Sequence, residues 1–386
     1  MCFSCRLYVS FWYNLNMNLS VGIVGLPNVG KSTLFNALLK KQQALAANYP
    51  FATIEPNVGV VPVPDKRLDK LAEIEKEELK LLGLPPKKPA TVEFVDIAGL
   101  VKGASEGAGL GNKFLAHIRE VSVISHVVRA FEDPNVIKEG SVDPKSDYET
   151  IRTELILADL QTLSKINEKT LRLDHVKKSA VEKLAAGLDK GKSAVDVELS
   201  DEERDSVKDL FLLTFKPEII VLNVSEQDYS LERIKETVTK FSNMLDISQD
   251  RFIVISAKIE SDLSELSEEE QKQYLKELGA EESGLERLIK KAYETLGLIS
   301  FLTAGEKEVR AWTIIKGSNA QKASGVIHTD FEKLFIKAEI VKYEDFVNPP
   351  AGGGGWKGSR EKGAARFEGK DYIMQEADVV EFKIGR

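Results

Sequence analysis

The segment "GLPNVGKST", from Gly25 to Thr33, constrains the fold of this chain more than any other feature. It matches the pattern GxxxxGK[ST], follows an apolar run that begins at Leu19, and precedes helical spacing from Lys31 to Leu39. In this context, a glycine-rich turn between a strand and a helix surrounds a nucleotide phosphate with backbone N–H groups and the helix N-terminus. The motif therefore predicts an α/β nucleotide-binding fold.

The residues of this loop have separate expected roles. Lys31 is expected to bridge the β- and γ-phosphate oxygens, and Ser32 to give its hydroxyl to Mg²⁺. An oxygen of Asn28 is a candidate ligand for K⁺ between the phosphates, while the alternative is that Asn28 is simply a turn residue. The other expected nucleotide-binding residues of the loop are Val29, Gly30 and Thr33.

A carboxylate that helps to hold the metal is expected at the end of the strand "VEFVD", and a group that senses the γ-phosphate is expected just after it. Asp96 ends this run and would hold Mg²⁺ through water, while the backbone N–H of Gly99 can reach the γ-phosphate. Loss of that hydrogen bond on hydrolysis would release the loop that follows. Thr53, in "YPFATIEPNVG", is the best candidate for a second hydroxyl on Mg²⁺.

The catalytic group is less obvious from the sequence. Signalling GTPases place a glutamine directly after DxxG to orient the attacking water, and this chain has Leu100 there, which cannot do so. The glycine-rich stretch that follows ends in His117, so a mobile loop would let His117 approach the water in a closed state. The alternative is a solvent-facing histidine at a helix start.

The base-reading segment departs from the usual Asn-Lys-x-Asp. Here it reads "NVSE", with Asn223, Val224 and Glu226. Guanine offers N1–H and N2–H₂ to a short carboxylate, and the longer Glu226 displaces those oxygens by about one methylene, a loss worth about 1 to 3 kcal/mol of recognition. The Asn223 amide can donate to N7 and accept from the adenine N6 amino group. The site is therefore expected to favour ATP, with a second base loop of Ser256, Ala257 and Lys258.

Six apolar runs predict buried strands, and their near-continuous hydrophobicity is typical of a doubly wound parallel sheet covered by helices on both faces. Helices are expected between them at 231–244 and 284–296. The runs begin at Leu19, Val58, Thr91, Val121, Glu218 and Arg251.

The chain is expected to divide into three domains after an N-terminal extension. Residues 17–140 and 216–300 would form the nucleotide domain, residues 141–215 an inserted helical hairpin that acts as a structural or partner-docking arm, and residues 301–386 a small β-rich domain. Residues 1–16 are interpreted as a non-native or disordered extension, with Met17 as the start.

Composition limits the possible environments. The 386 residues are 42% hydrophobic and 30% charged, with a net charge of −8, so any nucleic-acid contact requires a local basic patch. The only cysteines are Cys2 and Cys5, which fits a reducing compartment. The apolar N-terminal run of roughly 10 residues is too short for a membrane span, which needs about 20. We therefore expect a cytoplasmic protein with no membrane association, and a monomer is favoured although the oligomeric state is left open.

A glycine-flanked basic stretch near the C-terminus is the best candidate for that patch. It carries an aromatic side chain for stacking, and the alternative is a disordered solubilising loop. The candidate RNA-facing residues are Trp356, Lys357, Arg360, Lys362 and Arg366.

Taken together, several segments resemble the YchF subfamily of Obg-type P-loop proteins, which are ribosome-binding ATPases. The resemblance covers nearly everything from Met17 to Arg386. It departs from the family's pattern in the N-terminal extension and in the glycine-rich "PPAGGGGWKGS". The segments that carry it are "GLPNVGKSTLFNAL", "YPFATIEPNVGVVPVPDKRLDKL", "DIAGLVKGASEGAGLGNKFLAHIRE", "NVSE" and "GEKEVRAWTIIKGSNAQKASGVIHTDFEKLFIKAEIVKYEDF".

The resemblance implies a Ras-like core, an inserted coiled coil and a C-terminal β-grasp-like TGS domain. It also implies a preference for ATP over GTP, slow hydrolysis stimulated by ribosomes, a role in translation or stress regulation, and His117 as the catalytic histidine. Two alternatives stay open: an Obg-type GTPase, and an RNA-binding scaffold whose nucleotide site is largely structural.

Overall fold

The computed structural model describes residues 19–46, 57–97, 109–131, 143–167, 173–348 and 354–385. The chain divides into two compact units, which we describe separately. Unit 1 comprises Met1–Val61 and Glu93–Ala292, and unit 2 comprises Pro62–Val92 and Tyr293–Arg386.

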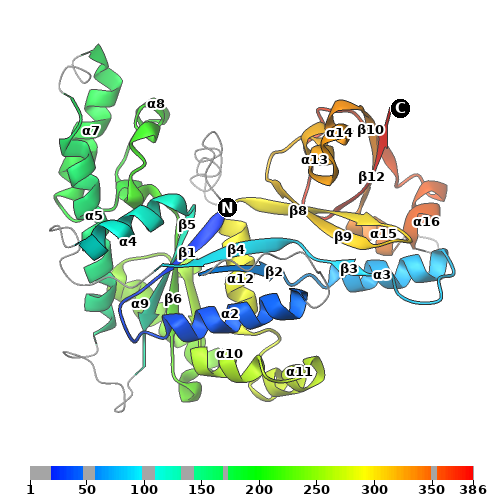
Figure 1. Cartoon of the computed structure of the whole chain (residues 1–386), viewed down its shortest axis with the longest axis horizontal. Coiled ribbons are helices and arrows are strands. Elements are labelled where there is room, and N and C mark those ends of the chain that lie inside the picture. The colour runs from blue at the N-terminus through cyan, green and yellow to red at the C-terminus, as the bar shows by residue number, and fades with distance from the viewer. Residues whose placement is uncertain are drawn as a thin grey trace. The chain divides into compact units, whose positions relative to one another are not determined.

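Unit 1 is built on a six-stranded sheet in the order β2-β4-β1-β5-β6-β7 (Figure 1). Parallel pairing joins β4 to β1, β1 to β5, β5 to β6 and β6 to β7, which confirms the predicted parallel sheet. The strands, in sheet order, are β2 (Val58–Pro62), β4 (Thr91–Asp96), β1 (Ser20–Val24), β5 (Val123–Arg129), β6 (Glu218–Asn223) and β7 (Phe252–Ile255).

The central strands are buried along their whole length, as their continuous hydrophobicity predicts. Every residue of β1 and β5 is buried, so both faces of the sheet are covered. The helices of this unit that contribute to the nucleotide domain are α2 (Lys31–Ala46), α4 (Gly109–Glu120), α5 (Pro144–Ser164), α9 (Leu231–Leu245), α10 (Ala257–Leu263), α11 (Glu268–Glu277) and α12 (Gly284–Thr295).

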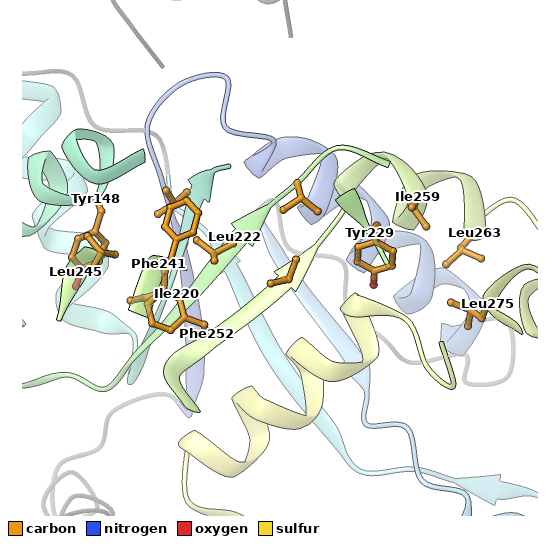
Figure 2. Packing of buried hydrophobic residues seen from close by; sticks show 13 residues of the cluster. Tyr148, Ile220, Leu222, Tyr229, Phe241, Leu245, Phe252, Ile259, Leu263 and Leu275 are labelled. Atoms are coloured by element: carbon orange, nitrogen blue, oxygen red, sulfur yellow. The ribbon is translucent and has the colours of Figure 1, made fainter. Parts of the chain in front are cut away.

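One buried cluster shows how α9, α10 and α11 attach to the sheet. Figure 2 shows Phe241 and Leu245 of α9 with Ile220 of β6 and Phe252 of β7 in this cluster. The same cluster continues to the first turns after the base-reading segments. The packing therefore fixes the carboxyl ends of β6 and β7, where the base loops begin.

The predicted helical insertion forms, but its first helix also belongs to the nucleotide domain. Ile151 and Leu155 of α5 lie in one cluster with Ile118 of α4 and Ile124 of β5. Further along, α5 packs against α7 (His175–Leu188) in a second cluster that includes Leu163 and Leu184. A short helix α8 (Asp201–Ser206) begins with a Ser200–Glu203 capping box. The arm and the sheet therefore share α5 and are not divided at residue 141.

Unit 2 contains a second six-stranded sheet in the order β11-β10-β12-β8-β9-β3. Antiparallel pairs β8–β9 and β10–β12 are joined by a parallel β12–β8 contact. Helix α13 (Ala320–Ile327) closes the core of this sheet, which includes Phe301, Ile340 and Val380. The strands, in sheet order, are β11 (Arg366–Glu368), β10 (Phe335–Lys342), β12 (Asp378–Ile384), β8 (Leu298–Ala304), β9 (Val309–Ile315) and β3 (Lys87–Lys88).

Residues 62–92, expected in the nucleotide domain, fold with unit 2. The reason is strand pairing: β3 runs parallel to β9, with Lys87 opposite Val309. Helix α3 (Arg67–Glu78) belongs to the same unit, in which Arg67 forms an ion pair with Glu376 at 2.6 Å. Three short helices complete the unit: α14 (Thr329–Lys333), α15 (Tyr343–Val347) and α16 (Gly355–Glu361).

Candidate nucleotide-binding site

The phosphate loop lies between β1 and α2, at the carboxyl end of the central strand. Two of its glycines are required by geometry. A Cβ on Gly25 would lie 2.8 Å from the Val127 carbonyl oxygen, and Gly30 has φ +94° with no room for a side chain. Asn28 also has a positive φ of 64°, which fits the turn-residue interpretation. The loop therefore has the tight, strained backbone that surrounds a phosphate.

Helix α2 begins directly after this loop, and its N-terminus presents the expected polar groups. The first backbone hydrogen bond of the helix runs from Leu34 N to Gly30 O at 3.0 Å. Ser32 and Thr33 are exposed at this end, so both hydroxyls are available to a ligand. The partial positive charge of a helix N-terminus favours an anion here.

Lys31 and Asp96, predicted to serve phosphate and metal respectively, form an ion pair. The Lys31 Nζ–Asp96 Oδ1 distance is 2.5 Å, and the ammonium also donates to Ile97 O at 2.8 Å. Parallel pairing places Asp96 opposite Ile23, one residue before the end of β1. The two charged groups thus lie at one edge of the sheet, where the Lys31 ammonium can bind a phosphate and the Asp96 carboxylate can bind a cation.

Asn223 connects the phosphate loop to the base loop. Its Nδ2 donates to Val29 O, and its Oδ1 accepts from Ala257 N, both at 2.9 Å. The side chain is 3% exposed. The sequence predicts only a base-reading role for Asn223 and not this connection, although an amide with both a donor and an acceptor can join two loops.

The other base-loop residues fall into two groups. Val224, Ser256 and Ala257 are buried and form the walls of this edge. Glu226 and Lys258 lie at the surface and form an ion pair with an Oε2–Nζ distance of 2.9 Å. This hydrogen bond and the carboxylate charge raise the pKa of Lys258 above its usual range. The Glu226 carboxylate is therefore already engaged by a cation of the second base loop.

His117 lies on a helix and not on the glycine-rich loop in which it was predicted. Helix α4 begins at Gly109, so His117 is in its last turn. The buried face of α4 consists of Phe114, Leu115 and Ile118, while the His117 side chain is exposed. The helix forms because apolar residues recur at a spacing of three and four. Two other expected residues, Thr53 and Gly99, lie outside the described residues, as does Leu100.

Within the basic stretch near the C-terminus, Gly355–Glu361 form helix α16 and Arg366 begins strand β11, where a loop was expected. Trp356 is half-buried: its ring packs edge-on against Phe346, and its Nε1 donates to Ala304 O at 3.3 Å. Arg360 lies 5.3 Å from the centre of the Trp356 ring. Packing within the unit thus already uses the side chain expected to stack on RNA.

The cations of this stretch are also partly neutralised. Arg360 makes two hydrogen bonds to Glu339, at 2.7 and 2.9 Å, and a third to Glu381 at 2.8 Å. Arg366 lies 4.0 Å from Glu368 in β11. Lys362 is the C-cap residue of α16 and also has an interaction partner. Lys357 is exposed, and its backbone N–H donates to Glu78.

No helix in the part of the chain that the structure describes is long and apolar enough to cross a membrane.

Two family models match this chain. The N-terminal match, over residues 20–165, is described as a 50S ribosome-binding GTPase. The C-terminal match, over residues 298–385, is to the YchF GTPase C-terminal family, described as a protein of unknown function (DUF933).

Known proteins are similar over nearly the whole length. A protein of Bacillus subtilis named Ribosome-binding ATPase YchF is 50% identical over 377 residues, covering 95% of this chain and 99% of the relative. The protein of the same name from Haemophilus influenzae is 47% identical, with the same coverage. A solved structure titled Structure of the Schizosaccharomyces pombe YchF GTPase has a TM-score of 0.79 and 37% identity, and covers 96% of this chain and 98% of that one. On this similarity of both sequence and fold, the chain belongs to the YchF family.

Proposed function

We propose that this chain is a ribosome-binding ATPase that works as a nucleotide switch. ATP with Mg²⁺ orders the loops around the phosphate site, the ordered state binds the ribosome in the cytoplasm, and hydrolysis releases it. The observation that carries the ATP assignment is the Glu226–Lys258 ion pair at 2.9 Å. To read guanine, the carboxylate at this position would have to be free to accept hydrogen bonds from the base. Relatives at 47–50% identity are named ribosome-binding ATPases.

The residues of the phosphate site fit a magnesium ion. Carboxylate and hydroxyl oxygens are the ligands that Mg²⁺ accepts, and Asp96 and Ser32 supply them beside a phosphate-binding loop. The bound ion would neutralise charge on the β and γ phosphates. We propose that the Thr53 hydroxyl would be a third oxygen ligand of Mg²⁺ and that the backbone N–H of Gly99 would donate to the γ-phosphate. Asn28 remains our candidate for K⁺, which predicts faster turnover in K⁺ than in Na⁺.

In this mechanism the charged pair of the site separates when nucleotide binds. The Lys31 ammonium would move from Asp96 to the phosphate oxygens, and the Asp96 carboxylate would then be free to hold Mg²⁺. His117 polarises or orients the attacking water, which requires α4 to bring its last turn toward the phosphate. Because Leu100 provides no polar group, hydrolysis in the absence of the ribosome is slow.

The C-terminal sheet is proposed to be a TGS domain, and it and the helical arm are the proposed ribosome-docking parts. The experiment is co-sedimentation of the full chain with ribosomes in ATP, ADP and a non-hydrolysable ATP analogue. We expect the ATP analogue to give the largest bound fraction. Equal binding in all three states would contradict the switch and favour the RNA-binding scaffold with a structural nucleotide site.

A second candidate is a GTPase of the same fold. It is favoured by the printed descriptions of the N-terminal family model and of the Schizosaccharomyces pombe structure, both of which say GTPase. A competition of labelled ATP with excess GTP separates the two: an ATPase retains the label, and a GTPase releases it.

A further inference from the structure

Two carboxyl groups on helix α3 have buried oxygens that lack a hydrogen-bond partner in the part of the chain that the structure describes. They are Oε1 of Glu75 and Oε2 of Glu78. Glu75 is only 2% exposed, and Glu78 follows it by three residues on the same helix. Side chains at this spacing lie on one face of a helix, so the two carboxyl groups are neighbours. Buried acceptors are rarely left without a hydrogen bond, and this pair therefore requires an explanation.

The other oxygen of Glu78 holds the N-terminus of α16. Its Oε1 accepts a hydrogen bond from Lys357 N at 2.8 Å. Lys357 is the third residue of α16, and the N-cap residue, Gly354, has no side chain that could accept this bond. The first N–H groups of a helix have no partner within the helix. A carboxylate of α3 thus takes the place of a capping side chain of α16.

The glycines before α16 are required by this contact. A Cβ on Gly355 would overlap Glu78 Oε2, and Gly355 has φ +89°. A Cβ on Gly354 would lie 3.2 Å from Ile74 Cδ1. At least these two positions of the glycine-rich "PPAGGGGWKGS" therefore allow α16 to approach α3 closely.

A single proton can satisfy both unpaired oxygens. A protonated carboxyl group has one O–H donor, whereas an ionised carboxylate only accepts. A proton on Glu75 can be donated to Glu78 Oε2, while Glu78 Oε1 keeps the Lys357 N–H. Burial raises the pKa of Glu75 to about 7, and the charge of Glu78 adds to this shift. At acidic pH, Glu75 is therefore the member of the pair that carries the proton.

The other charged groups around α3 do not replace this proton. Arg360 is bound to Glu339 at 2.7 Å, and Lys88 is paired with Glu308. Strand β8 has no charged residue. The titratable or charged residues of the other elements that pack against α3 are Lys87 and Lys88 of β3, Arg310 of β9, Tyr343, Glu344 and Asp345 of α15, and Lys357, Arg360 and Glu361 of α16.

We propose that Glu75 and Glu78 share one proton and form a pH-sensitive contact that holds the N-terminal turn of α16 against α3. With the proton bound, the two carboxyl groups are joined and Glu78 caps the turn. Loss of the proton places two negative charges in one buried site, so the Glu78 carboxylate is repelled and the turn that carries Trp356 and Lys357 is released. The proposal concerns unit 2 alone and does not depend on the proposed ATPase function.

The sign of the pH dependence follows from the tighter binding of the proton in the closed contact. The contact is strongest at low pH, where Glu75 is protonated whether the contact is closed or open. It weakens as the pH rises from about 4.5 to about 7, the range between the ordinary pKa of a glutamate and that of buried Glu75. Above this range the contact stays weak and changes little.

Hydrogen exchange of the nucleotide-free full chain from pH 5 to pH 9, corrected for the intrinsic effect of pH on exchange, tests the contact. The readout is the protection of the Lys357 amide, whose N–H donates to Glu78. We expect this protection to fall about tenfold between pH 6 and pH 8 and to level off at higher pH. Helix α13, in the same unit, is the internal control, and its protection should not follow this profile.

Three variants identify the groups that titrate. Glu75→Gln keeps a donor for Glu78 but cannot ionise, so the protection of Lys357 should become independent of pH. Glu78→Gln can still accept from Lys357 N but carries no charge, so the tenfold fall should shrink. Glu77→Gln, at an exposed position of the same helix, is the matched control and should behave like wild type.

Several results would overturn the proposal. One is a wild-type protection of Lys357 that is the same at pH 6 and pH 8, and another is an equal fall in Glu75→Gln and wild type. A gain of protection on addition of Ca²⁺ or Mg²⁺ at constant pH would show that the pair holds a metal ion in place of a proton. If Glu75→Gln does not fold, an equal fall in Glu78→Gln and wild type contradicts the shared proton.

Discussion

Asn223 and Val29 are joined by a hydrogen bond of 2.9 Å from the Asn223 side-chain amide to the Val29 carbonyl oxygen. Because the same amide also accepts from Ala257 N, one buried side chain sets the spacing between the phosphate loop and the second base loop. The tie also explains the glycine at position 30: a Cβ there would lie 2.2 Å from the Asn223 amide nitrogen. We therefore expect nucleotide binding to depend on Asn223 through these two hydrogen bonds, whether or not its side chain touches the nucleotide.

Replacing Asn223 by alanine tests this tie. The variant leaves two buried backbone groups without a partner, and each costs about 1 to 3 kcal/mol. We expect a lower free energy of unfolding and a fall in ATP affinity of at least tenfold, measured by urea unfolding and by titration calorimetry. Asn243→Ala, at an exposed position of α9, is the control. Unchanged ATP affinity in Asn223→Ala would show that the loops are positioned by other contacts.

Replacing Lys31 by methionine tests the charged pair. The substitution keeps the length of the stem but removes the ammonium that lies 2.5 Å from Asp96 and is proposed to move to the phosphate. We expect ATP turnover to fall by about 100-fold or more, since such charge stabilisation is usually the largest catalytic term. Lys40→Met, whose lysine forms an exposed pair with Glu265, should turn over ATP like wild type. Turnover within threefold of wild type in Lys31→Met would refute the assignment.

Shortening Glu226 to aspartate tests the base-reading argument. The change moves the carboxylate back by one methylene and weakens its pairing with Lys258, so the oxygens become available to the guanine edge. We expect GTP affinity to rise relative to ATP affinity by about tenfold, the scale of one such contact. Glu232→Asp, in the first turn of α9, is the matched control. An unchanged ratio would mean that Glu226 does not discriminate between the bases.

Buried Glu75 predicts a pH dependence of stability. Burial raises the pKa of its carboxyl from about 4.5 to about 7, and the charge of Glu78 adds to this shift. A carboxyl that binds its proton more tightly when folded favours the folded state at low pH, and this contribution is lost as the pH rises from about 4.5 to about 7. Glu75→Gln should therefore be more stable than wild type at pH 8, by roughly 1 to 3 kcal/mol.

Urea unfolding followed by tryptophan fluorescence measures this effect, because Trp312 and Trp356 both lie in unit 2 with Glu75. The advantage of Glu75→Gln should shrink as the pH falls to 5, where Glu75 is protonated in the folded chain. Glu77→Gln, at an exposed position of α3, should show no such trend. A constant difference between Glu75→Gln and wild type across this range would contradict the titration.

The nucleotide domain could be predicted from the sequence because its signals are local. The buried strands and the phosphate loop each occupy a few consecutive residues, and the predicted strand starts agree with the structure to within about two residues. The helix predicted at 231–244 is observed as Leu231–Leu245. In these segments, hydrophobic periodicity and tertiary packing favour the same conformation.

The rest depended on contacts between residues far apart in the chain. Nothing near Lys87 shows that two residues will pair with β9, more than 200 positions away, so the sequence predicts the wrong unit for residues 62–92. Nor does the stretch around Trp356 show that Glu339 will take up Arg360.

The central claim is that this site prefers adenine because the Glu226 carboxylate is not placed to accept hydrogen bonds from N1–H and N2–H₂ of guanine. Titration calorimetry of the full chain with ATP and with GTP, in the presence of Mg²⁺, tests it most directly. We predict that ATP binds at least tenfold more tightly than GTP. Equal affinities would contradict the claim, and tighter binding of GTP would contradict it and favour the GTPase of the same fold.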